Sequence, residues 1–219
     1  LKAAGRFKEN VRPSSWQLLD RDVDAHTPVH FAALSIKEWL AKLSAIVPGV
    51  DRTSYVVTPS ASSRVLRDGE PVGSGNGHVW VRAENPDDIE RARSTILLRA
   101  MQAEMSWSKP RYSKLEPGTV VGQSPTTIID PSVWTTGRLV FVGQPSVGDG
   151  LTVLPVSAEV HRHDSTVLDT SAMVLPDRKT VTELAKKAGV SWNVTSDGEG
   201  VRITADDLTL EAEIETKDH

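Results

Sequence analysis

Acidic and imidazole side chains stand at the ends of three apolar segments in this chain. Asp20 and Asp22 follow a pair of leucines, His78 follows the glycine-rich stretch GSGNG, and Asp130 ends the segment TTIID. Sites in sheet proteins are usually built where strands end. Carboxylate oxygens are the ligands that hard cations such as Mg²⁺ and Mn²⁺ prefer, and these cations leave room for phosphate groups. The three segments together predict a divalent-cation site that accepts phosphates.

The pair Asp20 and Asp22 gives the strongest chemical signal. In a strand the two side chains would point the same way, about 6–7 Å apart, and their charges would repel each other. A divalent cation between them makes the arrangement favourable, and Asp130 would supply a third oxygen ligand. Asp130 also precedes Pro131, and Asp-Pro favours a turn, so a purely structural role for Asp130 stays open. Each pattern alone is common in turns; their succession along the chain is the informative feature.

Phosphate ligands are predicted around His78. The glycines before it, including Gly77, would let backbone N–H groups approach a triphosphate, with Asn76 beside them. The imidazole could then donate to a phosphate oxygen. Further hydroxyl and cationic partners are Ser60, Ser62, Ser63, Lys109, Arg111 and Lys114.

The elements that must position these residues alternate between strands and helices. Strands are predicted at 16–20, in SYVVTP (54–59), in HVWVRA (78–83), at 126–130 and at 137–142. Helices are predicted in SIKEWLAKLSAIV (35–47), with a Ser35/Glu38 capping box, in 85–105, with Asn85 as N-cap, and in TVTELAKKAG (180–189). Residues 106–125 are predicted to be an irregular basic connection, and 143–179 mostly loop. Two or three strands are predicted in the tail, with a hairpin at Asp197 to Gly200.

This order predicts a mixed α/β domain with a mixed sheet over residues 1–175, followed by a small α+β appendage over 176–219.

The chain has 219 residues, 38% of them hydrophobic and 25% charged, which is enough apolar material for a core. It contains no cysteine, which excludes disulfides, zinc ribbons and thiol catalysis. A net charge of −4 indicates no global basic field for nucleic acid, although a local basic groove remains possible. No apolar run approaches the ~18 residues of a membrane span.

The succession of motifs resembles the archaeo-eukaryotic primase superfamily, in the branch of primase-polymerase domains from phage and plasmid replication proteins. The matching segments are Asp20-Arg21-Asp22, PSASS, GNGHVWV, TIIDPSVW and GRLVFVGQP, which together span about residues 16–145. The chain departs from the family pattern at Asn76, where serine is usual. It also lacks the basic residue that often stands before the third acid, since 124–127 read Ser-Pro-Thr-Thr. Lys109, Arg111 or Lys114 would have to replace it.

The resemblance implies a primase-like catalytic core with an RRM-like unit. It also implies nucleotidyl transfer that depends on Mg²⁺ or Mn²⁺, with Asp20, Asp22 and Asp130 as catalytic metal ligands. His78 and its glycine approach would hold the incoming nucleotide. The implied partners are a single-stranded DNA template, nucleoside triphosphates and a helicase domain or protein, in the cytoplasm of a bacterial or archaeal host, at its nucleoid, with no membrane.

Two other functions stay open. One is a non-catalytic or degenerate nucleic-acid-binding module of ferredoxin-like or RRM-like fold, which includes an inactive primase domain, although its three acids would then be unexplained. The other is a rolling-circle endonuclease that binds metal through His161 and His163 and uses Tyr55 or Tyr112 as nucleophile. Arg162 disfavours the buried strand which that motif needs, and a polar loop is the predicted setting of the two histidines.

Overall fold

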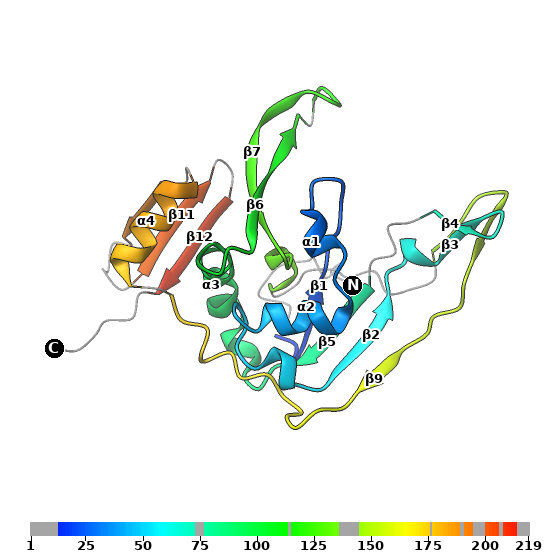
Figure 1. Cartoon of the computed structure of the whole chain (residues 1–219), viewed down its shortest axis with the longest axis horizontal. Coiled ribbons are helices and arrows are strands. Elements are labelled where there is room, and N and C mark those ends of the chain that lie inside the picture. Colours follow the sequence, from blue (N-terminus) through cyan, green and yellow to red (C-terminus); the bar gives the residue numbers. More distant parts are fainter. Residues whose placement is uncertain are drawn as a thin grey trace, which may run out of the picture.

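The computed structural model describes residues 13–72, 77–113, 115–135, 145–175, 177–188, 191–194, 200–205 and 208–213 (Figure 1). The α-helices are α1 (Val29–Ala32), α2 (Ile36–Leu43), α3 (Ile89–Gln102) and α4 (Arg178–Ala188). The strands are β1 (Trp16–Asp20), β2 (Tyr55–Pro59), β3 (Val65–Arg67), β4 (Glu70–Pro71), β5 (Gly77–Arg82), β6 (Ser106–Tyr112), β7 (Val120–Thr127), β8 (Leu151–Val153), β9 (Glu159–His161), β10 (Ser191–Val194), β11 (Gly200–Ala205) and β12 (Leu208–Glu213). The fold is therefore mixed α+β, as predicted at the coarse level.

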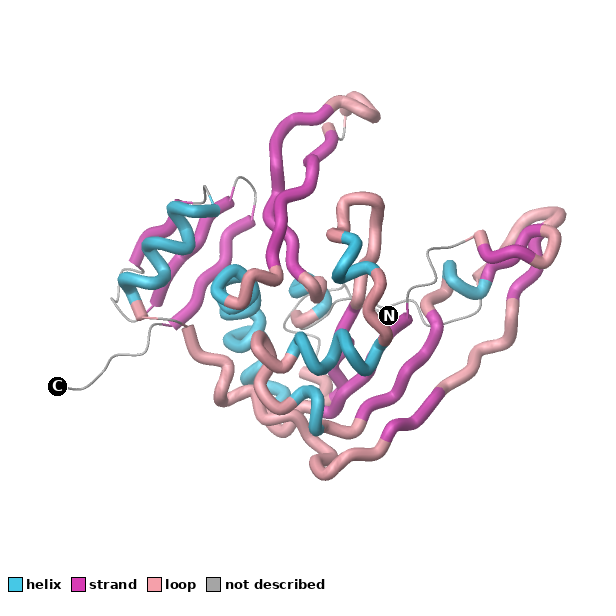
Figure 2. Tube along the Cα trace, viewed as in Figure 1, coloured by secondary structure: helices cyan, strands magenta, loops and turns pink. Residues whose placement is uncertain are grey.

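The central sheet has the strand order β1-β5-β2-β9. Helix α2 lies between β1 and β2 in the chain, and β5 is inserted between these two strands, antiparallel to both (Figure 2). This is a split β-α-β arrangement. A mixed sheet was expected, but every pairing between the described strands is antiparallel. Outside these strands, the described residues contain two isolated parallel bridges, Thr53 with Ser165 and Ala83 with Leu168.

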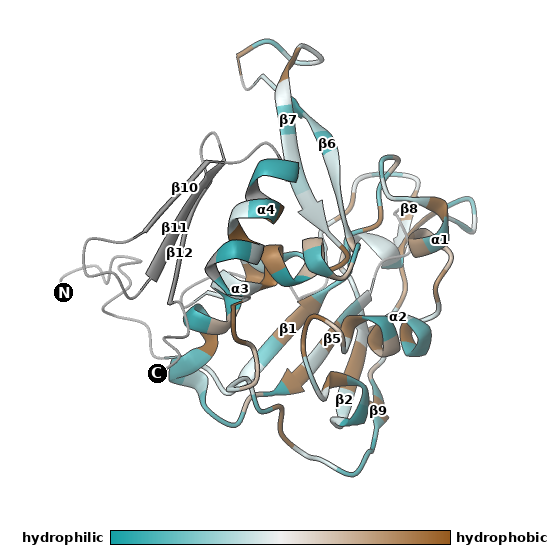
Figure 3. Cartoon of the chain, turned by 60° about the vertical axis from the view of Figure 1, so that its left-hand side comes forward, coloured by the Kyte–Doolittle hydropathy of each residue, from teal (hydrophilic) through white to brown (hydrophobic). Residues whose placement is uncertain are grey.

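Helices α2 and α3 cover one face of the central sheet. Side chains of alternate strand residues, such as Leu19 on β1 and Val79 on β5, are fully buried against Trp39 of α2 and Ile96 of α3. The hydropathy colouring shows both hydrophobic and hydrophilic residues along α3 (Figure 3). The opposite face carries Asp20 and His78, since successive strand side chains point to opposite sides.

The predicted caps at Ser35 and Asn85 are confirmed, while α4 begins at Arg178, two residues before the predicted start. The Ser35 hydroxyl accepts from the Glu38 amide, and the Glu38 carboxylate accepts from the Ser35 amide, which is the expected capping box. Asn85 accepts from the amide of Asp87, and Pro86 follows it as the first residue of a 3₁₀ turn that leads into α3. These caps fix where α2 and α3 begin, and so where their apolar stripes meet the sheet.

The predicted irregular connection at 106–125 is wrong, because β6 and β7 form an antiparallel hairpin that projects from the body (Figure 1). The amino-acid composition of this hairpin does not indicate strands. Lys109, Pro110 and Pro125 are poor strand formers, and the ladder contains an irregularity between Arg111 and Tyr112. The hairpin is long enough to pair with itself without the central sheet.

The predicted strand at 126–130 is also corrected. Thr127 ends β7, the chain bends at 128–129, and Asp130 becomes the N-cap of a 3₁₀ turn at Pro131–Val133. The predicted loop at 143–179 contains the short strands β8 and β9, while the predicted strand at 137–142 lies outside the described residues.

The tail forms helix α4 and a three-stranded antiparallel sheet, β10-β11-β12, as expected. Helix α4 and strand β12 both contact α3. Of the hairpin predicted at Asp197 to Gly200, only Gly200 is described, and it begins β11. The predicted helix stop at Gly189 lies outside the described residues, and the domain boundary at 175/176 stays a prediction. None of the described helices has the length and apolar character needed to cross a bilayer.

Arg91 and Asp88 fasten the segment before the tail to α3. The Arg91 guanidinium donates to the carbonyls of Met173 at 2.7 Å and Thr170 at 2.8 Å, while it pairs with Asp88. Thr170 donates its hydroxyl to the same carboxylate. Hydrogen bonds from Arg91 and Thr170 hold the pKa of Asp88 below its ordinary value. This network keeps Met173 fully buried.

We expect Asp88→Asn to lower the free energy of unfolding at pH 7 by about 1–3 kcal/mol, because it breaks a charged hydrogen-bond network. A depressed folded-state pKa stabilises the fold above the unfolded-state value of about 4, and the benefit is lost as the pH falls through the folded-state pKa. Urea unfolding at pH 7 and pH 3 should therefore show a smaller loss of stability for Asp88→Asn than for wild type. Asp51→Asn, at an exposed carboxylate, is the control; equal losses in all three proteins would contradict the prediction.

Candidate functional site

The first two predicted segments meet in the central sheet. In the register of β1 and β5, Asp20 lies directly opposite His78, and His78 lies opposite Thr58 of β2 on its other side. Leu19 and Val79 face the core, so Asp20 and His78 share the opposite face of the sheet. The burial pattern of two strands therefore places an acid and an imidazole side by side.

His78 is held in place by its neighbours on β5 and β2. Its ring lies edge-on to Trp80 at 6.1 Å between centroids, and the Trp80 indole donates to the Thr58 hydroxyl at 3.1 Å. In the described part of the chain, the buried Nδ1 of His78 has no hydrogen-bond partner. A buried polar atom in that state calls for an explanation, and a ligand is one.

The third predicted segment is attached to the end of β1. The amide of Asp130 donates to the carbonyl of Asp20 at 3.0 Å. Two residues earlier, the carbonyl of Ile128 accepts from the indole of the buried Trp39 at 2.8 Å. The Asp130 carboxylate accepts from the amide and hydroxyl of Ser132, at 2.8 and 2.7 Å, and so caps the following turn. Asp130 therefore has the structural role that the sequence left open. Its backbone hydrogen bond to Asp20, and not this cap, brings the two residues together.

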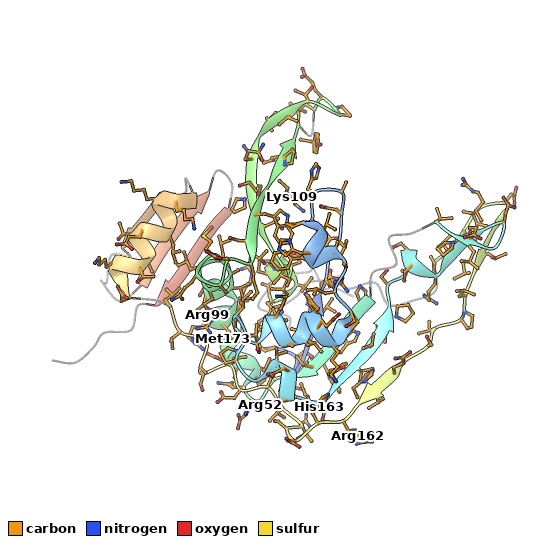
Figure 4. All side chains as sticks on the ribbon, in the orientation of Figure 1. Arg52, Arg99, Lys109, Arg162, His163 and Met173 are labelled. Carbon is orange, nitrogen blue, oxygen red and sulfur yellow. The ribbon has the colours of Figure 1, made fainter. Side chains whose placement is uncertain are left out.

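Asp22 and Asp130 line one cavity of about 220 Å³ at the base of the β6–β7 hairpin. Lys109 lines it from β6, where Figure 4 labels it, and lies 3.5 Å from Asp24. The other lining residues are Arg93, Leu97, Pro125, Thr126, Thr127, Pro131 and Ser132. Asp20 and His78 do not line this cavity, so the predicted site has two parts, joined by the backbone bond between Asp20 and Asp130.

None of the other described candidates for phosphate binding from the sequence lines this cavity. Ser60, Ser62 and Ser63 form a turn just after β2, where the Ser63 hydroxyl donates to the Ser60 carbonyl at 2.9 Å. Arg111 lies two residues beyond Lys109 on β6. Asn76 and Lys114 lie outside the described residues.

Arg93 is the cavity residue that sequence reasoning missed. It stands one helical turn before Leu97 on α3, and both side chains line the cavity. The sequence marks Arg93 only as a charged residue on the edge of an otherwise apolar helix stripe, which does not by itself indicate a cavity. Its role became visible only when the hairpin and Asp130 closed the space around it.

The cavity supplies part of the ligand set that a hard divalent cation needs. Among the described residues, no three His, Cys, Asp or Glu side chains lie together in a way that could hold a metal ion. Asp22 and Asp130 supply two carboxylates to one cavity. Mg²⁺ is commonly bound by one or two carboxylates together with waters and substrate phosphates, so this donor set suits it.

His161 and His163 both stack on Tyr55, with ring centroids at 4.5 and 5.5 Å. His161 ends strand β9, opposite Tyr55, rather than lying in the polar loop that was predicted. Tyr55 is a buried residue, and burial, followed by the charge of Glu159, raises the pKa of its phenol. A raised pKa disfavours the phenolate, which weighs against Tyr55 as the nucleophile of a rolling-circle nuclease.

No family model, curated protein or solved structure matches this chain. Its function therefore has to be argued from its own residues and their geometry.

Proposed function

We propose that the chain is a DNA-templated nucleotidyltransferase, a primase or primer-extending polymerase, that serves replication of a phage, plasmid or other mobile element. The observation that supports this most is the convergence of three segments at one end of β1. Asp20 pairs with His78 across the strands, and its carbonyl accepts from the amide of Asp130. An acid pair, an imidazole and a third acid are the groups that the primase-like motifs require.

The split β-α-β topology gives the proposal a second support. A primase-like core contains an RRM-like unit, and in the central sheet β5 is inserted antiparallel between β1 and β2, with both helices on one face. This leaves the face with Asp20 and His78 free of helices α2 and α3.

In the proposed mechanism the chain positions reactants and stabilises charge, which is most of what phosphoryl transfer asks of a protein. Asp22 and Asp130, which line one cavity, would hold Mg²⁺ or Mn²⁺, with Asp20 as the third proposed ligand. The ion would activate the 3′-hydroxyl as a Lewis acid and neutralise the triphosphate. His78, with Gly77 and Asn76, orients the phosphates of the incoming nucleotide. Lys109 and Arg111 add positive charge, and Lys114 follows them in the sequence.

The proposed partners are a single-stranded DNA template and nucleoside triphosphates, with a helicase domain or protein acting beside them. The proposed location is the cytoplasm of a bacterial or archaeal host, at the nucleoid.

The decisive experiment is primer synthesis and extension on single-stranded DNA with labelled ribo- and deoxyribonucleotides. We expect products with Mg²⁺ or Mn²⁺, none with EDTA, and none from the Asp20→Ala/Asp22→Ala protein. Circular dichroism of the double variant checks that it folds. The proposal is wrong if the wild-type protein makes no product with either metal from ribonucleotides or deoxyribonucleotides. Single-stranded DNA binding without synthesis would then favour the non-catalytic binding module.

A further inference from the structure

We infer that Arg93 is a phosphate-binding residue of the cavity at the base of the hairpin, and that this cavity shares the triphosphate of the incoming nucleotide with the part of the site that contains His78. The inference rests on the proposed function for the identity of the ligand, but its test needs neither template nor synthesis. Arg93 belongs to none of the sequence motifs. It is defined by its place on α3, where it lines the same cavity as Lys109 and Asp130 and donates to the carbonyl of Pro131.

The guanidinium of Arg93 is anchored at one nitrogen and available at the other two. Its Nε donates to the carbonyl of Pro131 at 3.0 Å. Among the described residues, neither of its terminal nitrogens has an acceptor, although the side chain is partly buried and lines the cavity. A planar guanidinium fixed in this way presents two parallel N–H donors, which match two oxygens of a phosphate group.

The charges around the cavity explain why a phosphate would enter with a cation. The carboxylates of Asp22 and Asp130 balance the positive charges of Arg93 and Lys109, and Asp24 adds a third carboxylate beside Lys109. Without a cation these groups are therefore slightly negative in sum and attract a polyanion only weakly. A divalent cation at the two carboxylates gives the site a net positive charge, and Arg93 and Lys109 then face the phosphate oxygens.

The size of the cavity favours a triphosphate over a nucleic-acid strand. Its volume of about 220 Å³ falls below the ~300–1,000 Å³ of pockets that enclose a whole drug-sized ligand. It can hold part of a nucleotide, with sugar and base outside. A triphosphate is a chain end and needs one entrance, whereas a phosphodiester within a strand needs a groove that is open on both sides.

The test is calorimetric titration of the full chain with inorganic tripolyphosphate, in Mg²⁺ and in EDTA. We expect binding in Mg²⁺ that Arg93→Gln weakens about tenfold or more, and Arg93→Lys by less, since lysine keeps the charge but not the paired donors. In EDTA, Asp22→Asn should raise the residual affinity, because it removes a repelling charge. In Mg²⁺ the same substitution should lower the affinity. This reversal of sign is specific to a phosphate and a cation that share the cavity.

Arg91→Gln is the matched control, because Arg91 lies on the same helix and binds backbone carbonyls away from the cavity. It should lower the free energy of unfolding and leave tripolyphosphate affinity unchanged. Equal affinity in wild type and Arg93→Gln, or no wild-type binding at millimolar concentration, overturns the inference. So does loss of affinity for a single-stranded 12-mer without loss for tripolyphosphate, which would assign Arg93 to the strand. Primer synthesis, measured separately, decides the proposed function in each case.

Discussion

Asp130→Asn is expected to reduce nucleotide incorporation by about 100-fold or more, by analogy with the loss of one preorganised electrostatic group. The same substitution should leave the free energy of unfolding within about 0.5 kcal/mol of wild type, because asparagine caps a helical turn as well as aspartate does. The Asp130 side chain accepts two hydrogen bonds from Ser132, and the asparagine carbonyl oxygen can still accept from the Ser132 amide. The substitution therefore removes the charge and keeps the cap.

Primer extension and urea unfolding, measured on the same preparations, check this expectation. Asp130→Ala is the companion variant: it should lose activity to the same extent and, in addition, about 1 kcal/mol of stability, since the cap is gone. Asp51→Asn, at an exposed carboxylate, should change neither quantity. Full activity in Asp130→Asn would reduce Asp130 to its capping role and remove the third acid from the proposed site.

Trp39→Ala is expected to lower the free energy of unfolding by about 3–5 kcal/mol, the range for truncating a buried tryptophan. Trp39 is a fully buried residue of α2, and it lies in the core with residues of the central sheet and of the segment before Asp130. Its indole also donates to the carbonyl of Ile128, which alanine leaves without that partner. Chemical unfolding followed by circular dichroism measures the loss directly.

Trp39→Phe separates packing from the hydrogen bond. Phenylalanine fills much of the space but leaves the Ile128 carbonyl unpaired, which should cost about 1–3 kcal/mol. Because Ile128 lies two residues before Asp130, we expect primer extension to fall in this variant at temperatures where it is fully folded. Leu98→Ala, a buried α3 residue outside the core cluster that holds Trp39, should lower stability without that loss of activity at the same folded fraction. Unchanged activity in folded Trp39→Phe would show that this bond does not position Asp130.

The helices and inner strands were predictable because local and tertiary preferences agree in them. Ser35 with Glu38, and Asn85 with Pro86, mark helix starts by their hydrogen-bonding chemistry, which acts within a few residues. The strand predicted at 78–83 is present as β5, where Val79 and Val81 are buried and alternate with His78 and Trp80, since burial of one face decides the register.

The hairpin and the Arg93 cavity were not predictable from local pattern. Strand formation in β6 depends on pairing with β7 and overrides the weak propensity of Lys109 and Pro110. Arg93 acquires a meaning only from Asp130 and Lys109, which lie on other elements. Chemistry that is assembled across elements leaves no periodic signal along one of them.

The hydrogen bond between the Asp130 amide and the Asp20 carbonyl has a consequence for how the molecule matures. It closes a loop that contains α2, β2, β5, α3 and the hairpin, and contacts between such distant residues form late because the chain entropy of closure opposes them. A nascent or truncated chain that ends before Asp130 could fold β1, β2 and β5 around α2, yet would lack the third acid and the closed cavity. Assembly of the proposed site is thereby coupled to completion of the chain through Asp130, and partly made copies of the protein would lack that site.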